Sequence, residues 1–208
     1  EALEEGWTHY TGSTGIPELR KAVAEYAGNL RGLKFDPDNV VITPGAKPIM
    51  FYAVLALVEP GDEVIYPNPG FPIYESMINF MGGVAVPLQL SERRDFRVNL
   101  EELEAKVSPK TRMIILNSPH NPTGGVLTRD DLAQIARIAE KHDLWVLADE
   151  IYSEIIYDGD HHSIATFPGL PERTAILDGF SKTYAMTGYR LGYLVAPRAW
   201  VERLVTLA

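Results

Sequence analysis

The alternation of short apolar runs with longer helical patterns is the feature that most constrains the fold of this chain. The runs are rich in Val and Ile and lie at residues 40–43, 63–66, 84–88, 112–117, 144–148, 174–179 and 191–196. Continuous apolar runs are typical of strands buried on both faces, and such strands occur in parallel sheets covered by helices. The sequence therefore predicts a three-layer α/β/α fold with a mainly parallel sheet.

Helical patterns fill the segments between these runs. They are expected at residues 17–31, 49–58, 73–81, 99–107, 128–139 and 199–207. Pro17 suits a first helical turn, and Gly32 ends the same helix. Thr128 and Asp131 have the spacing of a capping box at the start of another helix. No internal repeat or long linker interrupts the pattern, so the sequence predicts one domain.

Charge and composition argue against several classes of partner. The 208 residues carry a net charge of −9, whereas a nucleic-acid-binding face requires clustered basic residues. The longest strongly apolar run, residues 49–58, is too short to cross a bilayer. The chain has no cysteine, which fits a reducing compartment and favours a cytoplasmic protein. We therefore expect neither a nucleic-acid nor a membrane partner, and any bound phosphate must be held by local contacts.

Unusual polar residues follow several of the predicted strands. Asn121 follows one strand, Asp149 ends the next, and Lys182 follows a third. A further strand leads through Gly45 to Lys47 into a helix, whose N-terminal N–H groups favour an anion. Ligands of open parallel sheets lie at the carboxyl ends of the strands. These residues are therefore expected to converge on one crevice.

Lys182 is expected in a loop of small and polar residues, 179–192, directly after a predicted strand. Its amine can form a Schiff base with a carbonyl group, and Arg190, eight residues on, can bind an anion such as a phosphate. Taken alone, the segment is better explained as a surface loop that carries two solvated cations. The other strand ends favour the chemical interpretation.

Four motifs in the same order resemble those of a known family. Residues 179–192 resemble the lysine signature of the class I/II aminotransferases, the fold-type I enzymes that use pyridoxal 5′-phosphate (PLP). Residues 117–124 resemble their Asn-Pro-x-Gly loop, residues 149–152 their Asp-x-x-Tyr element, and residues 15–20 the start of their first helix. The likeness covers nearly the whole chain and implies the large cofactor-binding domain.

The resemblance implies roles for the residues that surround the cofactor ring. Lys182 would form a Schiff base with PLP and then move a proton between the substrate Cα and the cofactor C4′. Asp149 would pair with the pyridinium nitrogen, while Tyr152 and Asn121 would bond the 3′ oxygen. Phe71 would stack on the ring. The ordinary alternatives are a helix cap at Asp149, a turn at Asn121 and a core aromatic at Phe71.

The resemblance also implies how the phosphate is held. Arg190 would bind it, together with the helix start at Gly45 and the backbone N–H groups of Ala46 and Lys47, whose side chain is expected to face solvent. Tyr10 matches the position that reaches the phosphate of the other subunit, which implies a homodimer with composite sites. One departure is Gly179, because many relatives carry serine or threonine there. The hydroxyl contact to the phosphate is then lost, so either the affinity for the cofactor is lower or Ser181 supplies the hydroxyl instead.

The function implied is transfer of an amino group between an α-amino acid and a 2-oxo acid. A PLP-dependent carbon–sulfur β-lyase or an aminocyclopropane carboxylate synthase-like enzyme shares the same fold and lysine. From another class, a non-catalytic aminotransferase-like sensor domain of a transcription regulator remains an alternative. No metal is expected, since His161 and His162 lack a third ligand at a suitable spacing.

The ends of the sequence suggest a fragment of a longer protein. It begins at Glu1 rather than methionine. In the family, the arginine that binds the substrate carboxylate lies in a C-terminal small domain, for which no segment is seen, and the N-terminal segment that lines the pocket is also missing. We therefore expect residues 1–208 to be the large domain, and this piece alone to bind PLP yet turn over poorly.

Overall fold

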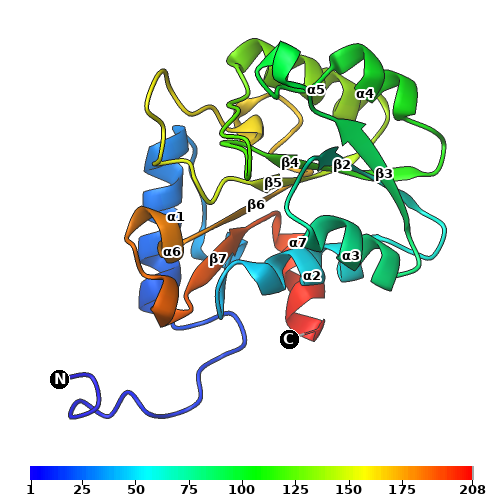
Figure 1. The fold of residues 1–208 in the computed structure, drawn as a ribbon. Coiled ribbons are helices and arrows are strands. Elements are labelled where there is room, and N and C mark those ends of the chain that lie inside the picture. Colours follow the sequence, from blue (N-terminus) through cyan, green and yellow to red (C-terminus); the bar gives the residue numbers. More distant parts are fainter. Residues whose placement is uncertain (208) are drawn as a thin grey trace.

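The computed structural model describes residues 1–207, which form a three-layer fold around a seven-stranded sheet (Figure 1). The strands are β1 (Val40–Thr43), β2 (Glu63–Asn68), β3 (Val84–Gln89), β4 (Thr111–Asn117), β5 (Trp145–Asp149), β6 (Thr174–Gly179) and β7 (Gly192–Val195). The α-helices are α1 (Pro17–Arg31), α2 (Lys47–Leu57), α3 (Ile73–Phe80), α4 (Leu100–Lys106), α5 (Arg129–Lys141), α6 (Phe180–Thr183) and α7 (Arg198–Leu207). Short 3-10 turns are η1 (Pro37–Asn39), η2 (Glu92–Arg94), η3 (Ile164–Thr166) and η4 (Thr187–Tyr189).

The strand order is β1-β7-β6-β5-β4-β2-β3. The pairs β2–β3, β2–β4, β4–β5 and β5–β6 are parallel, which confirms the predicted mainly parallel sheet. Strand β7 runs antiparallel to both β6 and β1. Only α6 and η4 lie between β6 and β7, and this link lacks the full helix that usually carries a parallel crossover.

Helices cover both faces of the sheet, as predicted. Helices α2, α3 and α7 pack on one face, where β-strand side chains such as Met113, Leu147 and Leu177 are buried. Helices α4 and α5 pack on the other face against side chains such as Ile114 and Val146. Helix α1 covers the end of that second face next to β6 and β7 (Figure 1).

The pleat of the strands decides which polar side chains meet. Side chains alternate between the two faces along a strand. Leu147 and Asp149 of β5 therefore share the α2 face, whereas the next residue, Glu150, lies on the α1 side. In the same way, Leu177 of β6 faces α2 and Asp178 faces α1. This separation places two different polar clusters on opposite sides of the same strand ends.

The predicted helix boundaries agree with the structure at most positions. Helix α1 begins at Pro17 and ends at Gly32, which has φ 65°. The capping box of Thr128 and Asp131 is formed at the start of α5. One expectation was wrong: Lys182 lies in α6, a single helical turn, and not in a loop. This turn lies in the segment where the chain reverses between β6 and its antiparallel neighbour β7.

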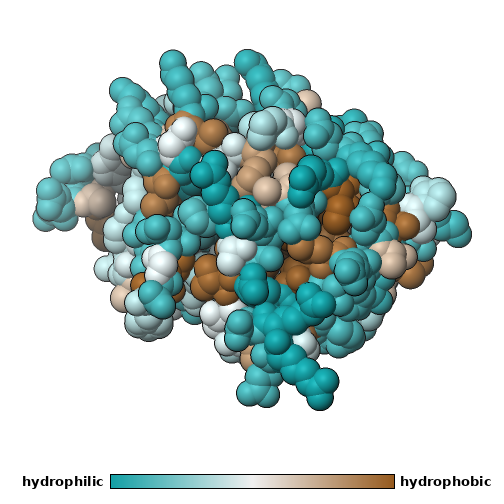
Figure 2. Space-filling model, turned by 90° about the horizontal axis from the view of Figure 1, so that it is seen from above, coloured by the Kyte–Doolittle hydropathy of each residue, from teal (hydrophilic) through white to brown (hydrophobic). Residues whose placement is uncertain are grey.

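The outer surface fits the sequence composition. Figure 2 looks down on the molecule from the side of α4 and α5, and it shows a mostly hydrophilic surface with smaller hydrophobic areas between. Within residues 1–207, no helix has the length and apolar character required to cross a membrane.

Candidate active site

A cavity of about 220 Å³ lies at the carboxyl ends of the central strands. Its lining contains the side chains predicted to converge there, namely Asn121, Asp149 and Lys182. The other lining residues are Ala46, Lys47, Met50, Phe71, Ile151, Tyr152, Leu177, Ser181, Thr187 and Arg190. The topology therefore brings together residues that are widely separated in the sequence, and it gives the cavity an acidic wall and a cationic wall.

Asp149 forms the acidic wall. It is 3% exposed, and its Oδ2 accepts a hydrogen bond of 2.6 Å from the hydroxyl of Tyr74. Its Oδ1 accepts a weaker bond of 3.3 Å from the N–H of Ile151. Burial raises the pKa of Asp149 to about 7, although both hydrogen bonds favour the ionised form. A cationic donor in the cavity would therefore shift this carboxyl group toward its charged state.

Asn117, the last residue of β4, fastens the loop that carries Asn121. Its side-chain amide donates to the carbonyl oxygens of Asp149 (3.0 Å) and Pro119 (3.2 Å). Its Oδ1 accepts the N–H of Asn121 at 2.8 Å. Asn117 is the first residue of the 117–124 motif, and no local pattern in the sequence assigns it a role. The structure shows that it ties the Asn121 loop to the end of β5.

Lys182 projects from α6 and is exposed to solvent. Its Nζ lies 5.5 Å from the centre of the Tyr152 ring, which belongs to the turn that follows β5. Among the described residues, Lys182 forms no ion pair. The amine is thus accessible from the cavity, and an aromatic face lies beside it.

Arg190 and the start of α2 form the cationic wall. The guanidinium of Arg190 packs directly against Gly45, so closely that a side chain at Gly45 would overlap it. Gly45 also has φ +87°, which L-residues with side chains rarely adopt. Its N–H donates to Thr43 O at 2.8 Å. Gly45 therefore contributes by leaving space, while the helix N-terminus at Ala46 provides the positive end of a helix dipole.

Lys47 stands at the edge of the cavity, beside the aromatic ring of Phe71. Its side chain is exposed, as predicted, but it also lines the cavity, and its Nζ lies 5.4 Å from the centre of the Phe71 ring. Phe71 in turn packs edge-on against Tyr74, with ring centres 6.1 Å apart. An exposed cation thus stands over the aromatic side chain predicted to stack on the cofactor, because the ring attracts it at this distance.

Tyr10 is the predicted site residue that this chain does not bring to the cavity. It is fully exposed on the N-terminal segment that projects from the fold (Figure 1). Gly179, the unexpected glycine, pairs with Gly192 of β7. A Cβ atom at Gly179 would lie 2.9 Å from the Gly192 Cα, so the strand pairing leaves no space for a serine or threonine. Ser181 and Thr187, which also carry hydroxyl groups, line the cavity.

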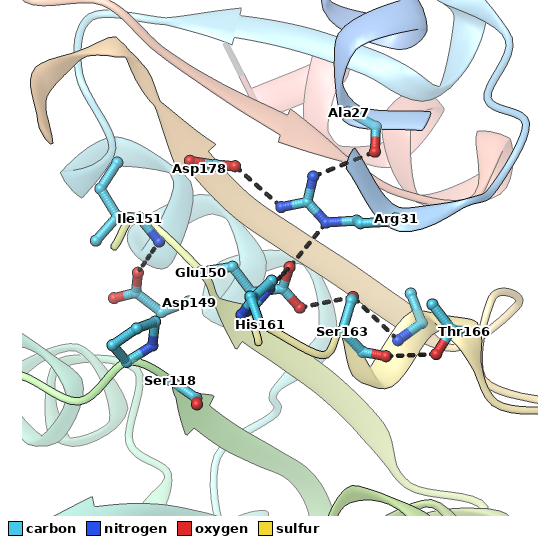
Figure 3. A network of polar contacts seen from close by, with 12 residues as sticks. Ala27, Arg31, Ser118, Asp149, Glu150, Ile151, His161, Ser163, Thr166 and Asp178 are labelled. Atoms are coloured by element: carbon cyan, nitrogen blue, oxygen red, sulfur yellow. Dashed lines mark hydrogen bonds and ion pairs between the residues drawn. The ribbon is translucent and has the colours of Figure 1, made fainter. Parts of the chain in front are cut away.

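A second polar cluster lies on the opposite side of the same strand ends (Figure 3). Arg31, at the end of α1, donates to Glu150 Oε2 at 2.8 Å and to Asp178 Oδ2 at 2.9 Å. Burial acts to raise the pKa of Glu150, but Arg31, His161 and Ser163 outweigh it and lower that pKa to about 2. The cluster joins the residue after Asp149 to the strand that leads into α6.

Sequence reasoning missed this cluster as well as Tyr74. Arg31 is separated from Asp178 by 147 residues, and Tyr74 from Asp149 by 75. No local pattern marks either pair, because a helical arginine or tyrosine is common. His161, considered as half of a metal pair, instead lies 3.1 Å from Glu150. His120 has its pKa lowered by burial to about 4, so it is neutral beside the Asn121 loop.

Comparisons with known proteins show which proteins this chain is similar to in sequence and fold. The family model described as "Aminotransferase class I and II" matches residues 1–208. The chain is 44% identical to aromatic-amino-acid aminotransferase 2 of Thermococcus litoralis, over 99% of the chain and 53% of that protein. It is 42% identical to an aspartate aminotransferase of Pyrococcus abyssi, over 99% of the chain and 53% of that protein.

The solved structures include an aromatic aminotransferase from Pyrococcus horikoshii. It superposes with a TM-score of 0.97 at 43% identity, covering 99% of this chain and 56% of that one. The chain therefore spans about half the length of the relatives that it matches.

Proposed function

This chain belongs to the class I and II aminotransferases, and from that premise we propose that the protein containing it is a PLP-dependent transaminase. It would move an amino group between an α-amino acid and a 2-oxo acid. The observation that carries the proposal is the meeting of Lys182, Asp149 and Arg190 in one cavity. An amine, a buried acid and an anion-binding end are the groups that this chemistry requires.

The residues fit PLP. When bound, PLP supplies an electron-accepting ring that stabilises negative charge at the substrate Cα. Asp149 has its pKa raised by burial to about 7, so it gains from a cationic partner such as a ring N–H. Arg190 and the N-terminus of α2 would hold the phosphate. Ser181 and Thr187 offer further hydroxyl donors at that end.

Lys182 would be both the covalent anchor and the proton carrier. Its exposed amine lines the cavity and can reach a carbonyl group there. Once free, the amine would move a proton between the substrate Cα and the cofactor C4′. Tyr152 and Asn121 would donate to the 3′ oxygen, and Phe71 would cover one face of the ring.

The domain and subunit assignments extend the same proposal. We propose that residues 1–208 are the large cofactor-binding domain of a longer protein, since the chain covers about half of its relatives. Tyr10 would complete the phosphate site of a second subunit in a homodimer. Its full exposure on a projecting segment supports this assignment, because no residue within 1–207 covers it.

A spectrum tests the cofactor and the lysine together. The full-length protein is incubated with PLP, its visible absorption is recorded, and the adduct is reduced with borohydride for peptide mass mapping. We expect a shifted absorption band and a pyridoxyl group on Lys182, both lost in Lys182→Ala and retained in the surface control Lys21→Ala. An amino donor should then bleach or shift the band and release the matching 2-oxo acid.

A protein that binds no PLP, or that carries the pyridoxyl group on another lysine, would contradict the proposal. A normal adduct at Lys182 without any amino transfer would retain the cofactor assignment and refute the transaminase assignment.

A further inference from the structure

We propose that Tyr74 is a positioning residue for Asp149: its hydroxyl, donated to Oδ2, favours the ionised carboxylate and fixes the orientation of this side chain at the cavity. This inference rests on the proposed function, because it concerns the residue assigned to the cofactor nitrogen. Tyr74 does not line the cavity and would not touch the substrate. It would act through Asp149.

The contact between the two side chains is short and fully enclosed. Tyr74 is 1% exposed and Asp149 is 3% exposed, and their oxygens are 2.6 Å apart. When Asp149 is ionised it can only accept, so the phenol donates its one hydrogen to Oδ2. Hydrogen bonds to charged groups in a buried setting are among the stronger ones in proteins. Tyr74 is therefore placed to favour the charged form of Asp149.

Few groups around Asp149 can stabilise its charged form. The N–H of Ile151 is its other hydrogen-bond donor, at a longer 3.3 Å. Glu150 and Asp178 act in the opposite direction, because their negative charges raise the pKa of Asp149. The cations that face the same cavity are Lys47 from α2, Lys182 from α6 and Arg190 after η4. None of these three forms an ion pair with Asp149 among the described residues.

Tyr74 also connects Asp149 to Phe71. The two aromatic rings pack edge to face, with an interplanar angle of 84°. The N–H of Tyr74 donates to the carbonyl oxygen of Phe71 at 3.1 Å, in the turn that begins α3. One buried side chain thus contacts both the acid and the aromatic residue assigned to the cofactor ring. Its ring holds Phe71 while its hydroxyl holds Asp149.

The substitution Tyr74→Phe separates these two effects. Phenylalanine keeps the ring that packs on Phe71 and removes only the hydroxyl. The pKa of Asp149 should then rise further above 7, by about one unit or more, since a charge-assisted hydrogen bond is lost. A matched control exists in Tyr193→Phe. Tyr193 is also buried, and its hydroxyl donates to another buried carboxylate, Asp178, at 2.9 Å.

The first measurement follows the Asp149 carboxyl carbon by NMR through a pH titration of the full-length protein without cofactor. We expect a higher midpoint in Tyr74→Phe and no upward shift in Tyr193→Phe, because a less ionised Asp178 can only lower the Asp149 midpoint. Circular dichroism and the unfolding midpoint establish that both variants fold. An Asp149 midpoint that does not move in folded Tyr74→Phe would overturn the inference, whether or not the protein binds PLP.

The second measurement is PLP affinity at two pH values. If binding requires ionised Asp149, Tyr74→Phe should bind about five- to fifteenfold more weakly than the parent protein at pH 7, and within about twofold at pH 9.5. A PLP analogue with CH in place of the ring nitrogen should show no such pH-dependent difference. Equal weakening at both pH values would refute the ionisation role. Failure of the parent protein to bind PLP would refute the proposed function instead.

Discussion

Replacement of Arg31 by methionine would leave two buried carboxylates without their common cation. Arg31 is fully buried, and so are the side chains of its partners Glu150 and Asp178. Methionine has a similar length and suits an apolar setting, so the change removes mainly the charge and the hydrogen bonds. The two carboxylates differ, because the pKa of Glu150 is lowered whereas burial keeps that of Asp178 raised.

The pKa of Glu150 indicates how much stability the protein should lose in Arg31→Met. Its pKa falls from the ordinary 4.5 to about 2. At about 1.4 kcal/mol per pKa unit, its native contacts favour the charged form by about 3 kcal/mol. Arg31 shares this effect with His161 and Ser163, but its loss also leaves Asp178 with fewer donors. Breaking a buried pair by removing one partner costs about 3–5 kcal/mol, so Arg31→Met should destabilise the protein by about that amount near pH 7.

The sign of the pH dependence follows from the same values. A carboxyl group whose pKa is depressed by folding contributes stability above its unfolded value, and this contribution is lost as the pH falls through the folded value. For Glu150, this window runs from 4.5 down to about 2. The difference in stability between the parent protein and Arg31→Met should therefore be full at neutral pH and should shrink in that acidic window.

Guanidinium unfolding, followed by the fluorescence of the packed Trp145–Trp200 pair, provides the assay. The control is Arg198→Met, which removes an exposed pair with Glu202 and should cost less than about 0.5 kcal/mol. Adding Glu150→Gln to Arg31→Met should recover part of the loss, because it removes one unpaired charge. A loss below about 1 kcal/mol, or no recovery in the double variant, would refute the reasoning.

Two further predictions concern glycines that leave space for neighbouring groups. Gly45→Ala should weaken PLP binding by about tenfold or more, because the added Cβ would displace the Arg190 guanidinium and the φ of +87° at this position is strained for alanine. Isothermal titration calorimetry with PLP measures the change in affinity. The control is Gly188→Ala, where the added Cβ meets open space. Gly179→Ser should lower stability by about 1–3 kcal/mol, since its Cβ would lie 2.9 Å from the Gly192 Cα. An unchanged unfolding midpoint for Gly179→Ser would contradict the tight strand pairing.

Much of the fold could be predicted from the sequence, because its signals are local. The helix that begins at Pro17 and ends at Gly32, and the capping box of Thr128 and Asp131, involve contacts within a few residues. The apolar runs identified the strands, since burial on both faces requires continuous hydrophobic sequence. Ligands of parallel sheets bind at the carboxyl ends of the strands, and this rule predicted that Asn121, Asp149 and Lys182 lie at one edge of the sheet.

Other features were decided only when distant segments packed together. The antiparallel direction of β7 and the helical turn at Lys182 depend on how the chain reverses after β6. The sequence shows only that position 179 lacks the hydroxyl found in many relatives. The structure supplies the reason, because the backbone of Gly192 lies too close to Gly179 to admit a side chain. The residues of an apolar or glycine-rich strand do not indicate whether the neighbouring strand runs parallel or antiparallel. The pairing of β6 with β7 therefore could not be predicted from a local sequence pattern.

The hydrogen-bond and ion-pair partners of the buried acids separate most clearly what the sequence determined from what the tertiary structure decided. The sequence by itself determined that Asp149 would end a buried strand, and the burial of that strand is what raises its pKa. Only the tertiary structure decided that Tyr74 would donate to its carboxylate and that Arg31 would bind the two acids on the opposite face. The physical reason is that hydrogen bonds and ion pairs are directional and short, so they form only where folding has already brought distant residues together.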